Sequence, residues 1–170
     1  MTHAANPEEL LEKLATDLEN LLERRSIDKP LMVGIHTGGV WLAEKLHQRL
    51  NLQDELATLD ISFYRDDFSR IGMNPQVKTS NLPQQVEDRH IILVDDVLQS
   101  GRTIRAALNE IFDYGRPASI TLACLIVRSG RELPIQADAV GQALELAHNE
   151  QIKLTGPEPL AWVIKTDNKT

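Results

Sequence analysis

Apolar positions along the first half of the chain fall into two spacings, one helical and one of short continuous runs. Leucines recur at helical spacing from Leu10 to Leu22, after Asn6 and Pro7, which are typical of a helix start. The pattern predicts a helix over residues 7–25. We expect its leucine face to pack on the protein's own core, and a partner-binding helix is the alternative.

Apolar runs at residues 31–35, 90–94 and 119–127 predict buried strands, and an alternating run predicts another strand at 58–64. Helical spacing returns at 40–50 and 103–112, and Gly115 is expected to end the second of these helices. After Val127 the pattern is irregular until a last short strand at 160–165. This order predicts an α/β fold with a mainly parallel, twisted sheet flanked by helices.

We expect one domain over residues 1–170, because no stretch resembles a dividing linker. Residues 65–85 are polar and are broken by Gly72, Pro75 and Pro83. So long a stretch without periodicity is uncommon inside a compact domain and is often functional. It is interpreted as a mobile lid over a site, with a disordered surface loop as the alternative.

Composition narrows the class of protein. The chain is 42% hydrophobic and 25% charged, which is typical of a globular domain, and its net charge of -7 argues against binding nucleic acid through bulk electrostatics. The single cysteine, Cys124, lies in an apolar run and is expected to be a small buried side chain in a reducing compartment. No apolar run is long enough to span a bilayer and the first residues do not resemble a signal peptide, so we expect a cytoplasmic protein.

The most informative segment joins an apolar run to a polar loop. Asp95 and Asp96 follow residues 91–94, and the loop that precedes the next predicted helix carries Ser100, Gly101 and Thr103. Unpaired N–H groups at a helix start bind anions, and glycine lets the backbone approach them closely. Ser100 and Thr103 can donate hydroxyl hydrogen bonds, and either could cap the helix. The loop therefore predicts a phosphate site.

The two acids need a different partner, since carboxylates beside a phosphate repel it. Ribose hydroxyls and a divalent metal ion are suitable partners. Together, the acids and the loop predict a site for a sugar phosphate at the carboxyl end of a strand. A second loop, at residues 36–39, also joins a strand to a helix, and its paired glycines suit either a strained backbone near an anion or a simple turn.

Residues 91–103 resemble the motif by which type I phosphoribosyltransferases bind phosphoribosyl pyrophosphate (PRPP). Segments 59–67, 115–119 and 131–135 are similar to the pyrimidine operon regulator family, PyrR, and the resemblance covers about residues 24–159. It implies a type I phosphoribosyltransferase fold with a small hood, in which residues 128–160 form the hood and the C-terminal segment. It also implies transfer of ribose phosphate from PRPP to uracil with Mg²⁺, giving UMP and pyrophosphate. Further implications are regulation of pyrimidine genes through binding of the operon leader RNA, and a homo-oligomer.

The resemblance assigns roles to individual residues. Asp95 and Asp96 bind the ribose hydroxyls and the metal and support positive charge at the anomeric carbon, and Arg65 acts with the lid that closes over the reaction. Residues 131–135 belong to the hood over the base. The remaining substrate-binding residues are Thr37, Gly38, Gly39, Val97, Leu98, Gln99, Ser100, Gly101, Arg102, Thr103, Val127 and Arg128, of which the first three receive pyrophosphate.

The chain departs from the family pattern at several of these positions. His36 and Gly38 stand where family members often have arginine, Gln99 where an aromatic residue is frequent, and Ser100 where threonine is frequent. Val127 stands where many members have aspartate beside the base.

Three alternatives to a uracil transferase therefore remain: a purine-base phosphoribosyltransferase, a nucleotide-sensing regulator with weak catalysis, and a purely RNA-binding regulator. The candidate cations for RNA are Arg24, Arg25, Lys29, Arg116 and Lys153.

Overall fold

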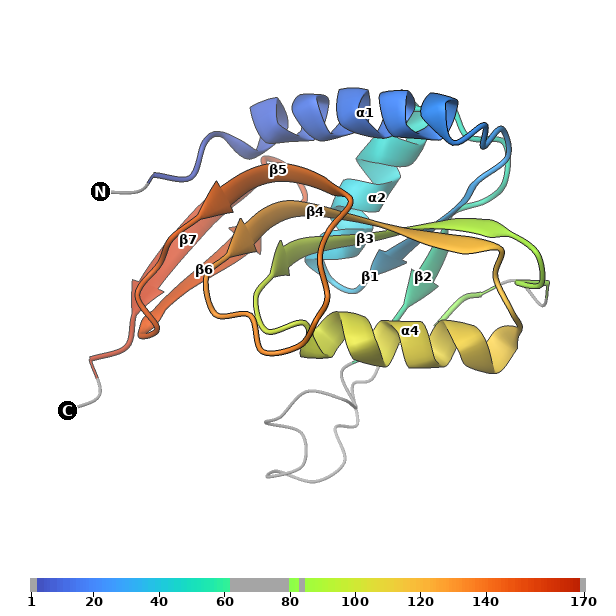
Figure 1. Ribbon diagram of the computed structural model, residues 1–170. Helices are drawn as coiled ribbons and strands as arrows, with labels where there is room; N and C mark the ends of the chain where they lie inside the picture. The colour runs from blue at the N-terminus through green and yellow to red at the C-terminus, as the bar shows by residue number, and fades with distance from the viewer. Residues whose placement is uncertain (1–2, 62–79, 83–84, 169–170) are drawn as a thin grey trace.

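The computed structural model describes residues 3–61, 80–82 and 85–168, and its central feature is a five-stranded parallel sheet (Figure 1). The strand order is β2-β1-β3-β4-β5, and β6 and β7 form a separate antiparallel hairpin. The predicted α/β fold with a mainly parallel sheet is confirmed. The elements are α1 (Pro7–Arg24), β1 (Leu31–Ile35), α2 (Gly38–Arg49), β2 (Ala57–Leu59), β3 (His90–Leu98), α4 (Arg102–Tyr114), β4 (Ser119–Arg128), β5 (Ala139–Leu144), β6 (Glu150–Thr155) and β7 (Ala161–Thr166).

Helices cover both faces of the sheet. In Figure 1, α1 and α2 lie above the sheet and α4 lies below it. All six leucines of α1 are buried, and the side chain of Asn6 accepts a hydrogen bond of 2.8 Å from the Glu8 N–H at the helix start. The leucine face therefore packs on the core of this chain, as the sequence predicted.

Strand β3 continues farther than the sequence suggested. Its apolar run was expected to end at Val94, but the ladder with β4 extends through Asp95, opposite Cys124, to Leu98, opposite Val127. The two acids consequently lie within a strand rather than after it. Asp95 is only 6% exposed, and its orientation is fixed by the sheet.

Other elements also begin or end at residues that differ from the predicted ones. Helix α2 begins at Gly38 rather than at residue 40, and α4 spans Arg102–Tyr114 rather than 103–112. Strand β2 ends at Leu59, before the predicted end at residue 64, and residues 62–64 lie outside the described part of the chain. Most of the expected lid, residues 65–85, lies outside it too, and so does Arg65.

The expectation of irregular structure after Val127 is wrong. Strand β5 extends the parallel sheet, and β6 pairs with β7, which confirms the strand predicted at 160–165 and supplies its partner. The hairpin is tied to the start of the chain, where Trp162 Nε1 donates a 3.0 Å hydrogen bond to the Ala5 carbonyl. No helix in the described residues is long and apolar enough to cross a membrane.

Candidate functional site

The loop between β3 and α4 is built around Gly101. Its φ of 94° is left-handed, a conformation that other residues rarely adopt, and it occupies the N-cap position of α4. Gly101, rather than Ser100 or Thr103, is therefore the N-cap residue of α4. The Ser100 hydroxyl instead accepts a 3.1 Å hydrogen bond from the Arg102 N–H, which holds the loop in its bend.

Residues of the 131–135 segment hold this loop from outside. The Ser100 carbonyl accepts hydrogen bonds of 3.0 Å from the N–H groups of Glu132 and Leu133. The Arg102 guanidinium also donates to Glu132, with 2.8 Å between Nε and Oε2. The segment expected to belong to the hood thus braces the loop between β3 and α4, so this loop is preformed.

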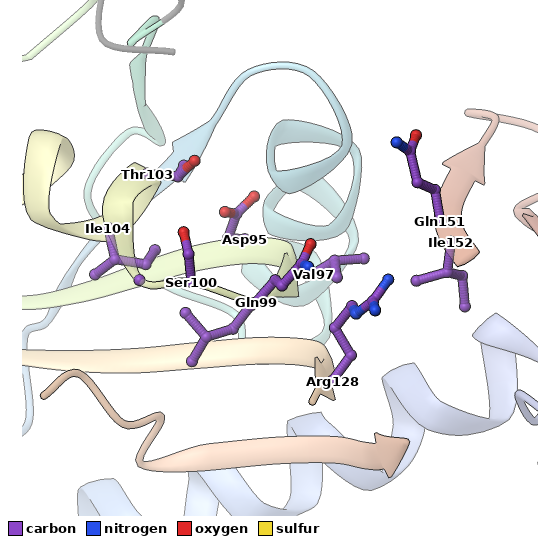
Figure 2. Close-up of a pocket in the computed structure, with 11 residues that line it drawn as sticks. Asp95, Val97, Gln99, Ser100, Thr103, Ile104, Arg128, Gln151 and Ile152 are labelled. Atoms are coloured by element: carbon purple, nitrogen blue, oxygen red, sulfur yellow. The ribbon is translucent and has the colours of Figure 1, made fainter. Parts of the chain in front are cut away.

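Asp95 faces a cavity of about 260 Å³ that the loop also lines. The Asp96 N–H donates to Asp95 Oδ1 at 2.9 Å, and the Val97 N–H donates to Asp96 Oδ1 at 2.8 Å, so one oxygen of each carboxylate is held by backbone. Figure 2 shows Asp95, Ser100 and Thr103 on one side of this cavity and Arg128, Gln151 and Ile152 on the other. Its lining includes one carboxylate, hydroxyls and backbone amides, groups that can bind the hydroxyls and the phosphate of a phosphorylated sugar.

The paired glycines of the 36–39 loop serve close packing. A Cβ built on Gly39 would lie 2.6 Å from the Val94 carbonyl oxygen, and one built on Gly38 would overlap the Asp96 carboxyl group. Neither residue has a positive φ, so the expected strained backbone is not the reason for these glycines. They bring the start of α2 directly against the strand that carries the acids.

A second cavity, of about 660 Å³, is lined by Asp96. Thr37, Gly38 and Trp41 line it from the glycine loop and α2, and residues 151–154 with Lys165 line it from the hairpin. Gln151 and Ile152 line both cavities, so the two are neighbours on either side of the acid pair. A ligand that lies across the acids can reach into both.

Arg128 lines the first cavity, but its hydrogen bonds are structural. Its guanidinium donates to the carbonyls of Ser129, Ala147 and Glu150, and only 4% of the residue is exposed. Burial lowers the pKa of this guanidinium from its ordinary value, and the neighbouring Glu150 partly opposes that effect. Arg128 thereby fixes the start of β6 to the end of β4.

A third, mainly apolar cavity of about 400 Å³ lies beside the first. Val127 lines it together with Leu98 and Gln99, while Arg131 and residues 135–137 form another wall. An aspartate at position 127 would place a charge in this lining. The apolar valine instead leaves the cavity wall without that charge.

The structure thus gathers residues from several parts of the chain around the acid pair. The sequence-predicted residues that line the first two cavities are Thr37, Gly38, Asp95, Asp96, Val97, Leu98, Gln99, Ser100, Gly101, Thr103 and Arg128. Sequence reasoning missed Trp41, Ile104, Gln151, Ile152 and Lys165 and gave Lys153 only as an RNA candidate. The alternation of polar and buried apolar residues at 150–155 was the available signal for β6.

The donor set also bears on metal binding. Within the described ranges, no three acidic, histidine or cysteine side chains cluster as a complete metal site. Asp95 and Asp96 nevertheless fit Mg²⁺, which in proteins is commonly held by one or two carboxylates together with ligand phosphates and water. The acid pair suits an ion that arrives with a phosphorylated ligand.

Comparisons with known proteins agree with this geometry. Residues 6–158 match the family model described as the phosphoribosyl transferase domain. The bifunctional protein PyrR of Nitrosococcus oceani is 62% identical over 162 residues, which cover 94% of this chain and 92% of that protein. The bifunctional protein PyrR of Pseudomonas aeruginosa is 59% identical over 156 residues, 92% of each chain.

Solved structures support the fold. The hypoxanthine phosphoribosyltransferase of Trypanosoma cruzi superimposes with a TM-score of 0.67 at 18% identity, covering 86% of this chain and 79% of that one. The hypoxanthine-guanine phosphoribosyltransferase of Bacillus anthracis gives a TM-score of 0.67 at 16% identity, covering 85% and 84%. At such low sequence identities the likeness shows the fold and does not indicate which base this chain uses.

Proposed function

Because the chain belongs to the phosphoribosyltransferase family, with bifunctional PyrR proteins as relatives across most of its length, we propose that it is a uracil phosphoribosyltransferase that also regulates pyrimidine genes. The observation that carries the catalytic part is the arrangement around Asp95 and Asp96. A preformed phosphate loop lies on one side of the acids and a glycine loop lies on the other. PRPP has the matching shape, since its ribose carries a phosphate at one end and a pyrophosphate at the other.

In the proposed complex, the 5-phosphate lies in the loop formed by residues 98–103, where Ser100, Gly101 and Thr103 face the first cavity. The ribose hydroxyls lie on the acid pair, and Thr37, Gly38 and Gly39 receive the pyrophosphate. Leu98, Gln99 and Arg102 complete the loop, and Val97, Val127 and Arg128 lie on the side where the base enters. Arg65 would act from the lid.

The reaction forms a bond from N1 of uracil to the anomeric carbon, breaks the bond from that carbon to the pyrophosphate oxygen and releases the N1 proton. Positive charge develops on the ribose as the bond breaks, and the carboxylates of Asp95 and Asp96 stabilise that charge. Mg²⁺, bound with PRPP, would neutralise charge on the departing pyrophosphate. The buried position of Asp95 strengthens its effect, since solvent screens a buried charge less.

The direct test is UMP formation from uracil and PRPP with Mg²⁺, with hypoxanthine and guanine as parallel substrates. We expect UMP to form and the purines to react much more slowly. Turnover of a purine alone would instead favour a purine-base transferase. PRPP binding without turnover of any base would favour a nucleotide-sensing regulator and would overturn the catalytic proposal.

The regulatory part rests on the PyrR relatives and on four of the candidate cations. Arg24 and Arg25 lie at the end of α1, Lys29 precedes β1 and Arg116 precedes β4, so all four lie near the amino-terminal edge of the sheet. Arg25 is partly engaged, since it donates to Thr121 and Asp138. Lys153 lies in the hairpin at the opposite edge and is not part of this group.

Filter binding of the pyrimidine-operon leader RNA, with and without UMP, tests this part. Binding should be strongest at low salt, because contacts from cations to phosphates weaken as salt rises. Failure to bind at low salt would remove the RNA role for that leader. We further propose that the chain works in the cytoplasm as a homo-oligomer, which light scattering of the purified protein would test.

A further inference from the structure

We propose that Lys153 and Lys165 of the β6–β7 hairpin bind the pyrophosphate group of PRPP from the side opposite the glycine loop. This inference rests on the proposed transferase function and adds a contact that the sequence pattern did not assign. Its starting point is the cavity of about 660 Å³ between the two loops, which both lysines line.

The register of the hairpin places the two lysines on one face. Gln151 pairs directly with Lys165, and Lys153 lies two residues farther along β6. Residues two apart on a strand, and residues directly opposite on its partner, project from the same face of a sheet. Lys153 and Lys165 are thus diagonal neighbours, with backbones about 7–8 Å apart, which leaves room for a phosphate group between their ammonium groups.

The neighbouring residues leave both cations available. Neither ammonium forms an ion pair or a hydrogen bond with another residue in the described part of the chain, and both residues are exposed. Gln151, which lies between them and the first cavity, is held by Asp167, with 3.3 Å between Nε2 and Oδ2. Among the residues that the structure describes, Asp96 is the only acid that lines the cavity, and it lies on the opposite wall.

The wall opposite the hairpin shows why a pyrophosphate in this cavity needs cations. Thr37 and Gly38 supply polar and backbone contacts there, but no positively charged side chain. Asp96 adds a negative charge that opposes a multiply charged anion. Two lysines on the facing wall make the electrostatic potential in the cavity positive. This effect is stronger because the cavity is partly enclosed. In this arrangement the ribose lies on the acids, and the leaving group extends toward the hairpin.

The position of the cavity favours pyrophosphate over the 5-phosphate. Ser100, Gly101 and Thr103 line the first cavity, whereas Lys153 and Lys165 line only the second. The 5-phosphate and the two lysines are therefore on different sides of the acid pair. Loss of the lysines should weaken the binding of ligands that carry pyrophosphate and leave the binding of UMP unchanged.

The experiment uses the single variants Lys153→Met and Lys165→Met and the double variant, with Lys13→Met as the matched control. Lys13 is an exposed lysine of α1 paired with Asp17, away from the cavity. Calorimetry with inorganic pyrophosphate and Mg²⁺, and with UMP, gives binding without turnover. Steady-state kinetics give KM for PRPP and for uracil and the inhibition constant of pyrophosphate.

For the double variant we expect KM for PRPP and the pyrophosphate inhibition constant to rise at least about tenfold, equal to about 1.4 kcal/mol. KM for uracil and the dissociation constant of UMP should change less than twofold. The double Lys→Arg variant should recover most of the affinity, which a merely structural role for the methylene chains would not predict.

Two outcomes separate this inference from the proposed function. If the wild-type protein forms UMP but the double Met variant keeps its KM for PRPP and its pyrophosphate affinity, the lysine assignment is wrong and the transferase stands. If the wild-type protein turns over no base yet binds pyrophosphate in a lysine-dependent way, the transferase proposal fails and the lysine site stands.

Discussion

Gly38, at the start of α2, lies directly against the carboxyl group of Asp96 on β3. A Cβ built on Gly38 would lie 2.9 Å from Cγ of Asp96, closer than real Cβ atoms approach. Because position 38 has no side chain, the carboxyl group of Asp96 on β3 can lie beside the start of α2. The two loops that the sequence suggested separately are one packed unit.

Gly38→Ala should reduce activity far more than stability. The new methyl group meets the end of a side chain that can turn away, so the fold accommodates it, and alanine also favours a helix by about 0.5–1 kcal/mol over glycine. Asp96 must leave its position, however, and we expect kcat/KM for PRPP to fall at least about tenfold. Steady-state kinetics and thermal unfolding measure the two effects.

Gln48→Ala, an exposed change on the same helix, is the control for Gly38→Ala. Unchanged kcat/KM in the Gly38 variant would mean that the position of Asp96 does not matter for turnover.

Asp96→Asn should lower turnover at least about tenfold, or about 1.4 kcal/mol in barrier, because the amide is nearly isosteric but cannot stabilise positive charge on the ribose. The backbone contact from the Val97 N–H can be kept by the amide oxygen, so the fold should be unaffected. The measurement is kcat for UMP formation, with Asp113→Asn on the exposed face of α4 as the control. A folded Asp96 variant with wild-type kcat would refute the role of this carboxylate.

Much of this fold follows from local patterns. The apolar runs of β1, β3 and β4 are buried on both faces, so they appear as continuous hydrophobic stretches in the sequence. Strand β5 was missed because its buried positions include the small residues Ala139 and Gly141, which carry little hydrophobic signal. Strand β6 has only two buried apolar residues among polar ones and is stabilised by its pairing with β7.

The same division applies to the site. The proposed phosphate loop, residues 98–103, is contiguous in sequence, so its residue types and their order could be interpreted directly. Lys153 and Lys165 reach the site only through the hairpin register and the packing of that hairpin over the sheet ends. Gly38 shows a further limit of prediction from sequence. The sequence suggested that this glycine serves backbone freedom, whereas in the structure it allows a close approach to Asp96. Contacts between distant segments need the fold.

Gly101→Ala should weaken both the fold and phosphate binding. A side chain at φ 94° costs about 1–2 kcal/mol, and its Cβ would lie 3.3 Å from side-chain atoms of Leu133 and Ile135. Urea unfolding measures the first effect and calorimetry with ribose 5-phosphate measures the second. Asn109→Ala, an exposed change on α4, is the control. Wild-type affinity for ribose 5-phosphate in the Gly101 variant would argue against this loop as the phosphate site.

Arg128→Lys should loosen the hairpin. Lysine keeps the charge but cannot donate to the carbonyls of Ser129, Ala147 and Glu150 together, and each buried carbonyl left without a donor costs about 1–3 kcal/mol. We expect a lower Tm and a higher KM for PRPP, since β6 carries Lys153 and Gln151 into the second cavity. Arg105→Lys on α4, which is exposed, should change neither quantity. A wild-type Tm for Arg128→Lys would show that the hairpin is held by other contacts.

Cys124 should be protected from thiol reagents while the chain is folded. It is fully buried opposite Asp95 in the sheet, and burial first, then the charges of Asp95, Asp96 and Asp138, raise the pKa of its thiol well above the ordinary value. A free thiol is half ionised near about pH 8.5, and only the thiolate reacts. Because folding raises this pKa, the thiol stays protonated through that pH, and iodoacetamide labelling followed by mass spectrometry should be slow until urea unfolds the chain. Labelling of the native protein at the rate of a free thiol would mean that the core beneath the acid pair opens readily, and that Asp95 does not stand on a rigid strand.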